Sequence, residues 1–192
     1  VLKMIPESGK LTDWTPVLVL AGYFLVHLFE HTVAPHFHFG EETHPEELGP
    51  KAGASALLGL WVHSFFDGLS IGSGFVIDPA LGLLLFVAIV LHKAPEGFTM
   101  ASVVLAAGGG RTQAMVAAAA VGAASLVGGL AIFVVRGIVG EALALSAGVT
   151  LYVAASDLVP EVNKDEGTAI ALTVFAGVVL YYFTERLLSH IL

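Results

Sequence analysis

Two short segments of this 192-residue chain combine a histidine with a carboxylate at a spacing suited to binding a metal ion. His63 precedes Asp67 by four residues, and His92 precedes Glu96 by the same interval. In an α-helix, side chains four residues apart lie on one face, one turn from each other. Imidazole and carboxylate groups from two such helices are ligands for divalent transition metals such as Zn²⁺. These residues therefore predict a metal site shared by two helices.

Both segments lie within long apolar stretches of the chain. Hydrophobic residues make up 56% of the sequence and charged residues 12%, and the mean hydropathy is +0.86. A water-soluble domain of this size cannot bury so much apolar surface, so the composition predicts an all-α polytopic membrane protein. Because ionisable groups are costly inside a bilayer, those retained there are expected to have a function.

The charge and residue content exclude several other classes of protein. The net charge of −8 leaves no basic patch for a nucleic acid. The absence of cysteine excludes disulfides and thiolate metal ligands. The first residues lack the ordered regions of a signal peptide. Since the chain begins with Val1 rather than Met, we expect a processed or truncated product.

Hydropathy predicts about six membrane spans, each close to the ~20 residues that a bilayer requires. They are expected at 16–34, 52–74, 80–107, 112–136, 140–161 and 168–190. Lys and Arg are spread too evenly between the loops to assign an orientation. We treat residues 1–192 as a single transmembrane transporter domain.

An internal repeat relates the two ends of the chain. The matching pairs are Met4–Ser8 with Leu158–Val162, and Ala21–Leu25 with Ala176–Leu180. The repeat makes the span at 16–34 equivalent to the span at 168–190, with opposite orientation, and such inverted repeats are typical of transporters. The second copy has two more spans than the first. We therefore expect about two spans to be missing before the segment 1–8; the alternative is a chance match between apolar helices.

Two residues inside the second segment affect the predicted site. Pro95 cannot donate a backbone hydrogen bond, so it is expected to kink its helix and free the carbonyl of Leu91. Transporters build cation sites from such free carbonyls beside carboxylates. Lys93 either pairs with a carboxylate as an internal counter-ion or extends toward the membrane surface. The alternative for the whole cluster is a polar contact between helices that binds no ligand.

Further candidate ligands lie near the ends of the predicted spans. Residues 31–50 form a His-rich acidic loop, which either binds metal loosely or is an ordinary solvated loop. Its histidines beyond the span are His36, His38 and His44. The four-residue spacing recurs in two more pairs, which are His27 with His31 and Asp157 with Glu161. Both pairs are candidate access ligands, and the alternative is that they are polar helix ends in water.

The motifs His63-Ser64-x-x-Asp67-Gly68 and His92-Lys93-x-Pro95-Glu96-Gly97 resemble the paired motifs of the ZIP (Zrt-, Irt-like protein) metal transporters. The His-rich loop and the segment Asp157–Glu161 fit the same family. The resemblance implies eight spans in a 3+2+3 arrangement, with residues 1–8 as the tail of the second. It also implies a cytosolic His-rich loop, transport of zinc or a similar divalent ion toward the cytosol, and a homodimer in the plasma membrane or a bacterial inner membrane.

The chain departs from the family pattern at positions associated with a second metal ion. Family members commonly carry Asn where Ser64 stands and Asp or Asn where Lys93 stands, and many carry a Glu in the following span. No Glu occurs around residues 124–128 of this chain. Because a fixed ammonium at Lys93 would repel a second dication, we expect a mononuclear site. Its ligands would be His63, Asp67, His92 and Glu96, with Ser64 and Lys93 as secondary residues.

Two other functions are compatible with the same ligands. An intramembrane zinc hydrolase would use Asp67 or Glu96 as general base, but the chain has no His-Glu-x-x-His motif. A family member that binds metal without transporting it is the second alternative. We expect a transporter rather than an enzyme, because two similar ligand sets suit a transit site better than a catalytic site.

Overall fold

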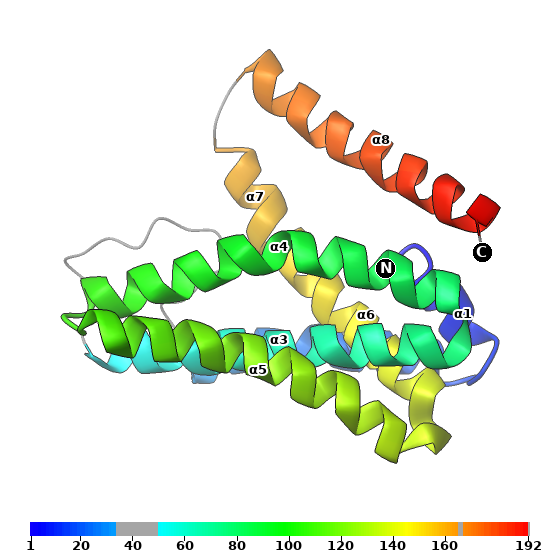
Figure 1. Ribbon diagram of the computed structural model, residues 1–192, viewed down its shortest axis with the longest axis horizontal. Helices are drawn as coiled ribbons and strands as arrows, with labels where there is room; N and C mark the ends of the chain where they lie inside the picture. Colours follow the sequence, from blue (N-terminus) through cyan, green and yellow to red (C-terminus); the bar gives the residue numbers. More distant parts are fainter. Residues whose placement is uncertain (34–49, 165–166, 192) are drawn as a thin grey trace.

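The computed structural model describes residues 1–33, 50–164 and 167–191. Every regular element in these ranges is helical, so the expected all-α fold is confirmed. The elements are α1 (Met4–Gly9), α2 (Thr15–Thr32), α3 (Pro50–Ile77), α4 (Pro79–Ala106), α5 (Arg111–Val134), η1 (Arg136–Ile138), α6 (Val139–Tyr152), η2 (Val153–Leu158), α7 (Val159–Val162) and α8 (Thr168–Ile191). Helices α3, α4 and α5 lie side by side and α6 crosses behind them, whereas α8 stands apart from this bundle (Figure 1).

Five helices of the described chain are long and apolar enough to cross a membrane. They are α3, α4, α5, the segment from η1 into η2, and α8, and they coincide with five of the six expected spans. The remaining expected span, 16–34, forms helix α2 but is not among the five. The last two turns of α2 carry His27, Glu30 and His31, which lower its hydropathy. Among the five, the segment that contains α6 is the most deeply buried.

The connection between α3 and α4 is a single residue, and its chemistry explains why the chain reverses there. Asp78 has an extended backbone, and its side-chain Oδ1 accepts a hydrogen bond of 3.0 Å from the backbone N–H of Leu81. This is the N-cap arrangement that satisfies a free donor at the start of a helix. Pro79 follows at the first helical position, where its missing N–H costs nothing. The cap and the proline make α3 and α4 antiparallel neighbours, which brings their His–carboxylate motifs to one level.

Proline affects the backbone at two places in different ways. Helix α4 runs through Pro95 as one helix. A π-helical segment, η2 (Val153–Leu158), occurs before Pro160. A proline removes one helical hydrogen bond, and a wider π-turn is a common way to accommodate that loss. The expected span 140–161 is therefore an α-helix, a π-helical turn and the short helix α7.

Glycines allow two pairs of helices to approach each other closely. A Cβ added to Gly68 of α3 would overlap the carbonyl oxygen of Ser125 in α5, and one added to Gly128 would overlap the carbonyl oxygen of Phe65. Small residues at such crossings are a general feature of membrane helix packing. The α3–α5 crossing therefore holds α3 in place next to Asp67, which precedes Gly68 in the chain. Helices α2 and α6 cross in the same manner at Gly22 and Gly148.

We expect Gly128→Ala to lower the stability of the protein by about 1–3 kcal/mol, because the new methyl group meets backbone that cannot move aside. Gly122→Ala, on the same helix, is the matched control, since nothing lies within 4 Å of a Cβ at Gly122. That substitution should be neutral or stabilising by about 0.5–1 kcal/mol. The melting temperatures of the purified variants in detergent compare the two. Equal melting temperatures would contradict the close approach.

Candidate metal site

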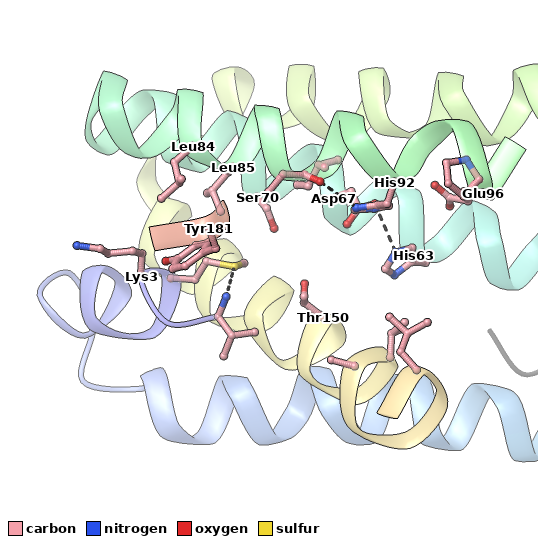
Figure 2. A pocket seen from close by; sticks show the side chains of 18 of the residues that line it. Lys3, His63, Asp67, Ser70, Leu84, Leu85, His92, Glu96, Thr150 and Tyr181 are labelled. Atoms are coloured by element: carbon pink, nitrogen blue, oxygen red, sulfur yellow. Dashed lines mark hydrogen bonds and ion pairs between the residues drawn. The ribbon is translucent and has the colours of Figure 1, made fainter. Parts of the chain in front are cut away.

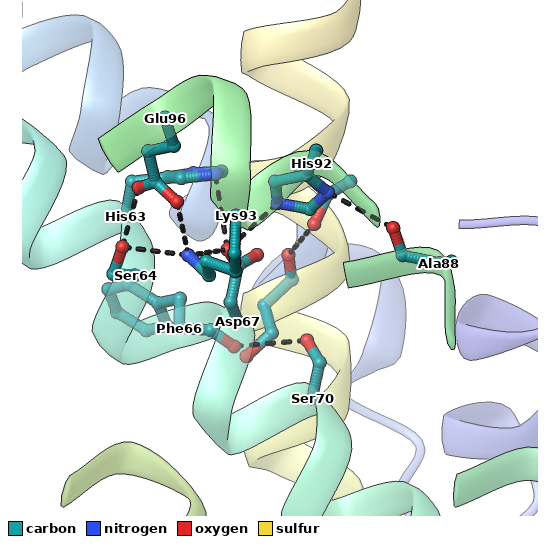
Figure 3. A network of polar contacts seen from close by, with 11 residues as sticks. His63, Ser64, Phe66, Asp67, Ser70, Ala88, His92, Lys93 and Glu96 are labelled. Carbon is teal, nitrogen blue, oxygen red and sulfur yellow. Dashed lines mark hydrogen bonds and ion pairs between the residues drawn. The ribbon is translucent and has the colours of Figure 1, made fainter. Parts of the chain in front are cut away.

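Three of the four predicted ligands converge between α3 and α4. His63 and Asp67 lie one turn apart on α3, and His92 faces them from α4 (Figure 3). Asp67 Oδ2 is 3.2 Å from His92 Nε2 and 3.4 Å from His63 Nε2. One ligand atom from each residue lies within 4.8 Å of the others. Two imidazoles and a carboxylate in this arrangement form a ligand set that suits zinc or a similar transition metal.

The cluster combines buried ligands with access to a cavity. Asp67 is 3% exposed and His63 is 8% exposed, whereas 45% of the His92 side chain is exposed. All three line a cavity of about 490 Å³ that is also lined by residues of α6, η2 and α8 (Figure 2). The remaining lining is mainly apolar. A cation that enters this cavity therefore meets polar ligands chiefly at the level of Asp67.

Lys93 occupies the centre of the polar network. Its Nζ donates hydrogen bonds to Asp67 Oδ2 at 2.7 Å, to Ser64 Oγ at 2.8 Å and to Glu96 Oε2. Of the two alternatives for Lys93, the structure shows the internal counter-ion. The ammonium neutralises one of the two carboxylate charges, so the network keeps one excess negative charge when the imidazoles are neutral. Such a charge attracts a divalent cation.

The fourth predicted ligand, Glu96, lies beside the three-residue cluster rather than within it. Its Oε1 accepts a hydrogen bond from Ser64 Oγ, and its Oε2 is paired with Lys93 (Figure 3). Glu96 is buried, with an exposure of 7%. The structure therefore brings Ser64, Lys93 and Glu96 together as a second half of the network.

Of the other predicted access residues, the structure describes the side chains of His27 and His31, which lie outside this network. His27 and His31 contact each other near the end of α2, with ring centroids 4.1 Å apart, and His31 Nδ1 lies 2.8 Å from the His27 carbonyl oxygen. They are not part of the three-residue group. Loop residues His36, His38 and His44 fall outside the described residues, and so do the side chains of Asp157 and Glu161.

A buried carboxylate in α2 was not predicted as a functional residue. Glu30 is 3% exposed, and its Oε2 accepts a hydrogen bond of 2.8 Å from the Tyr152 hydroxyl. A second polar contact joins α2 to η2, because the hydroxyls of Tyr23 and Ser156 are 3.0 Å apart. These contacts join α2 to α6 and to η2. A carboxylate within an apolar stretch could have marked Glu30 as a functional candidate from the sequence. Only the tertiary structure identifies Tyr152 as its partner.

Comparisons with known proteins identify the family to which the chain is similar. The ZIP Zinc transporter family matches residues 49–184 of the chain. Zinc transporter ZIP9 of Xenopus tropicalis is 30% identical over 173 residues, which cover 82% of this chain and 55% of that protein. Zinc transporter ZIP9 of Micropogonias undulatus is 29% identical over 161 residues, which cover 77% and 51%. The chain thus spans about half the length of these curated relatives. No solved structure shows a significant match.

We expect Asp67→Asn to weaken Zn²⁺ binding to the purified protein by at least about 100-fold. Mutation of a residue that only hydrogen-bonds to a metal ligand already lowers metal affinity about 10- to 100-fold, and loss of a ligand should cost more. The amide keeps the size of the side chain but removes the charge that both imidazoles approach. Ser70→Ala is the control, because the Ser70 hydroxyl donates only within its own helix, to the Phe66 carbonyl oxygen at 3.0 Å. Isothermal titration calorimetry measures both affinities. Similar affinities for the two variants would exclude Asp67 as a ligand.

Proposed function

The chain belongs to the ZIP family of zinc transporters, and on this basis we propose that it carries Zn²⁺, or a similar divalent ion, across a membrane toward the cytosol. The observation that supports this proposal is the convergence of His63, Asp67 and His92 between two helices that are long enough to span a membrane. Ionisable residues at such a position usually mark an ion pathway. The relatives are named as zinc transporters and not as enzymes.

Each residue of the site has a distinct role in this proposal. Asp67 compensates the charge of the ion, and the imidazoles of His63 and His92 favour zinc over calcium or magnesium, which prefer oxygen ligands. Glu96 completes the ligand set after its carboxylate separates from the Lys93 ammonium. Release requires weaker binding, which protonation of a ligand provides. We place this activity in a plasma membrane or a bacterial inner membrane, with the homodimer as the assembly.

We further propose that the site holds one metal ion. The Lys93 ammonium lies within hydrogen-bonding distance of both Asp67 and Glu96, the two carboxylates that a second ion would have to share with the first. A unit positive charge so close to a dication is strongly repelled in a low-dielectric environment. Ser64 adds a neutral hydroxyl at this place, and that hydroxyl already contacts both Lys93 and Glu96.

We expect His63→Ala and Glu96→Ala to reduce zinc uptake into proteoliposomes by about 90% or more, because each change removes a ligand from the path of the ion. Ser70→Ala should keep normal uptake, and the amount of reconstituted protein is matched between samples. Uptake that persists in both variants would refute the proposed site. If the unmodified protein binds zinc but moves none, the chain is a metal-binding family member without transport activity.

Metal content tests the single-ion proposal separately. We expect the purified, zinc-saturated protein to hold one zinc ion per chain at this site, measured by inductively coupled plasma mass spectrometry, with Asp67→Asn as the blank. Lys93→Asn should raise the site content toward two ions, because it exchanges the repelling ammonium for a neutral oxygen ligand. Two ions in the unmodified protein would contradict the proposal.

A further inference from the structure

The Lys93 ammonium contacts the same oxygen atom as the two histidines of the cluster. Asp67 Oδ2 is 2.7 Å from Lys93 Nζ, 3.2 Å from His92 Nε2 and 3.4 Å from His63 Nε2. An ion held by both imidazoles would bind this oxygen, which lies close to both rings (Figure 3). In the described structure, a cation that belongs to the chain itself therefore stands beside the oxygen that the transported ion needs.

The ammonium and a divalent ion compete for this position. Zinc binds carboxylate oxygens at about 2.0–2.2 Å. Since the ammonium is 2.7 Å from the same oxygen, the two cations would lie no more than about 5 Å apart. Their repulsion is poorly screened there, because the Asp67 carboxylate is buried from water. We therefore expect a bound ion to displace the ammonium from Asp67.

Other contacts keep the ammonium close to the cluster. Lys93 Nζ donates hydrogen bonds to Glu96 Oε2 and, at 2.8 Å, to Ser64 Oγ. The Ser64 hydroxyl is a neutral acceptor, so it can hold the ammonium while an ion occupies the carboxylates. Without the ammonium, the empty site would contain two uncompensated negative charges, from Asp67 and Glu96. With it, the empty site has one.

This charge balance matters for a carrier, because its site has to return empty after each ion is released. An unpaired carboxylate in the low-dielectric part of a membrane is costly, and two of them are more so. A second ion that binds on the way back would remove this cost. A cation built into the chain removes most of it without any second ion.

We propose that the Lys93 ammonium substitutes for the transported ion in the empty site, so that the empty carrier returns without a second ion. This inference rests on the proposed transport, since only a carrier has a return step. The ion displaces the ammonium from the carboxylates when it binds, and the ammonium moves back when the ion leaves. The same competition lowers the affinity of the site for zinc, which favours release.

A comparison of net uptake with zinc exchange isolates the return step. In net uptake, zinc enters proteoliposomes that contain a chelator, so the site has to return empty. In exchange, radioactive zinc enters proteoliposomes preloaded with unlabelled zinc, and the site returns with an ion bound. Both rates are measured at saturating zinc, with the membrane potential clamped at zero. Because slower release of a tightly bound ion lowers both rates, their ratio reports the empty return.

We expect Lys93→Met to raise the ratio of exchange to net uptake by about 10-fold or more. This variant keeps the length of the side chain but leaves both carboxylates without a cation, and an unpaired buried charge raises a barrier by more than a tenfold change in rate requires. Lys93→Arg keeps the positive charge and should keep the ratio close to that of the unmodified protein. A ratio for Lys93→Arg as high as that for Lys93→Met would overturn the proposal, since the effect would then follow shape and not charge.

Zinc affinity tests the competition without reference to transport. We expect Lys93→Met to bind zinc about 10-fold more tightly or more, because the ion no longer has to displace an ammonium. Isothermal titration calorimetry of the purified protein measures this affinity, with Asp67→Asn as the blank. An unchanged or weaker affinity in Lys93→Met would overturn the competition and the proposal with it.

Lys10→Met is the matched control for loss of a paired lysine. Lys10 lies outside the site and pairs with Glu7, three residues away, at 2.7 Å, just as Lys93 pairs with Glu96 at that separation in sequence. Its ratio of exchange to net uptake should equal that of the unmodified protein. The proposal is overturned if Lys93→Met leaves the ratio unchanged, or if Lys10→Met raises it as much. If the unmodified protein binds zinc but shows neither uptake nor exchange, the proposed transport itself fails, and the return role fails with it.

Discussion

Two carboxylates buried between membrane helices impose the constraint on which the rest of the structure depends. An unpaired carboxylate in such a place costs several kcal/mol, so Asp67 and Glu96 need partners. The ammonium of Lys93 contacts both, and it thereby fixes the level at which α3 and α4 face each other. The same carboxylates are the groups that would bind a divalent ion. Stability of the empty site and affinity for the ion are therefore linked through one lysine.

The remainder of the fold keeps this network in register. The one-residue connection at Asp78 sets α3 and α4 antiparallel, and the glycine crossing with α5 holds α3 from its other side. Helix α6 lies deepest in the bundle, and η2 at its end lines the cavity near the cluster. A π-helical segment is a local irregularity that often occurs at functional sites. In this protein it ends at Leu158 and α7 begins at Val159, one residue before Pro160.

Sequence reasoning predicted the helices well because their signals are local. Long apolar stretches separated by Asp78-Pro79 and by glycines gave five of the spans that the structure describes as candidate membrane helices. Sequence reasoning was less successful for α2. This segment is a helix, but the polar residues in its last two turns lower its hydropathy below that of the five candidate spans. It also passed over Glu30 as a functional candidate. That carboxylate is buried against Tyr152, a residue 122 positions away, and no local pattern reveals such a partner.

The sequence by itself determined which side chains could form the site, because a four-residue spacing places His63 with Asp67 on one helical face. It also placed Lys93 beside His92 without indicating which way the ammonium turns. Only the tertiary structure decided that Lys93 reaches across to Asp67 and Ser64, and that Glu96 pairs with it rather than joining the histidines. The physical reason is that side chains on different helices can pair only where the helices cross at the right angle and height. Backbone packing sets both, and it is not encoded in any local stretch of sequence.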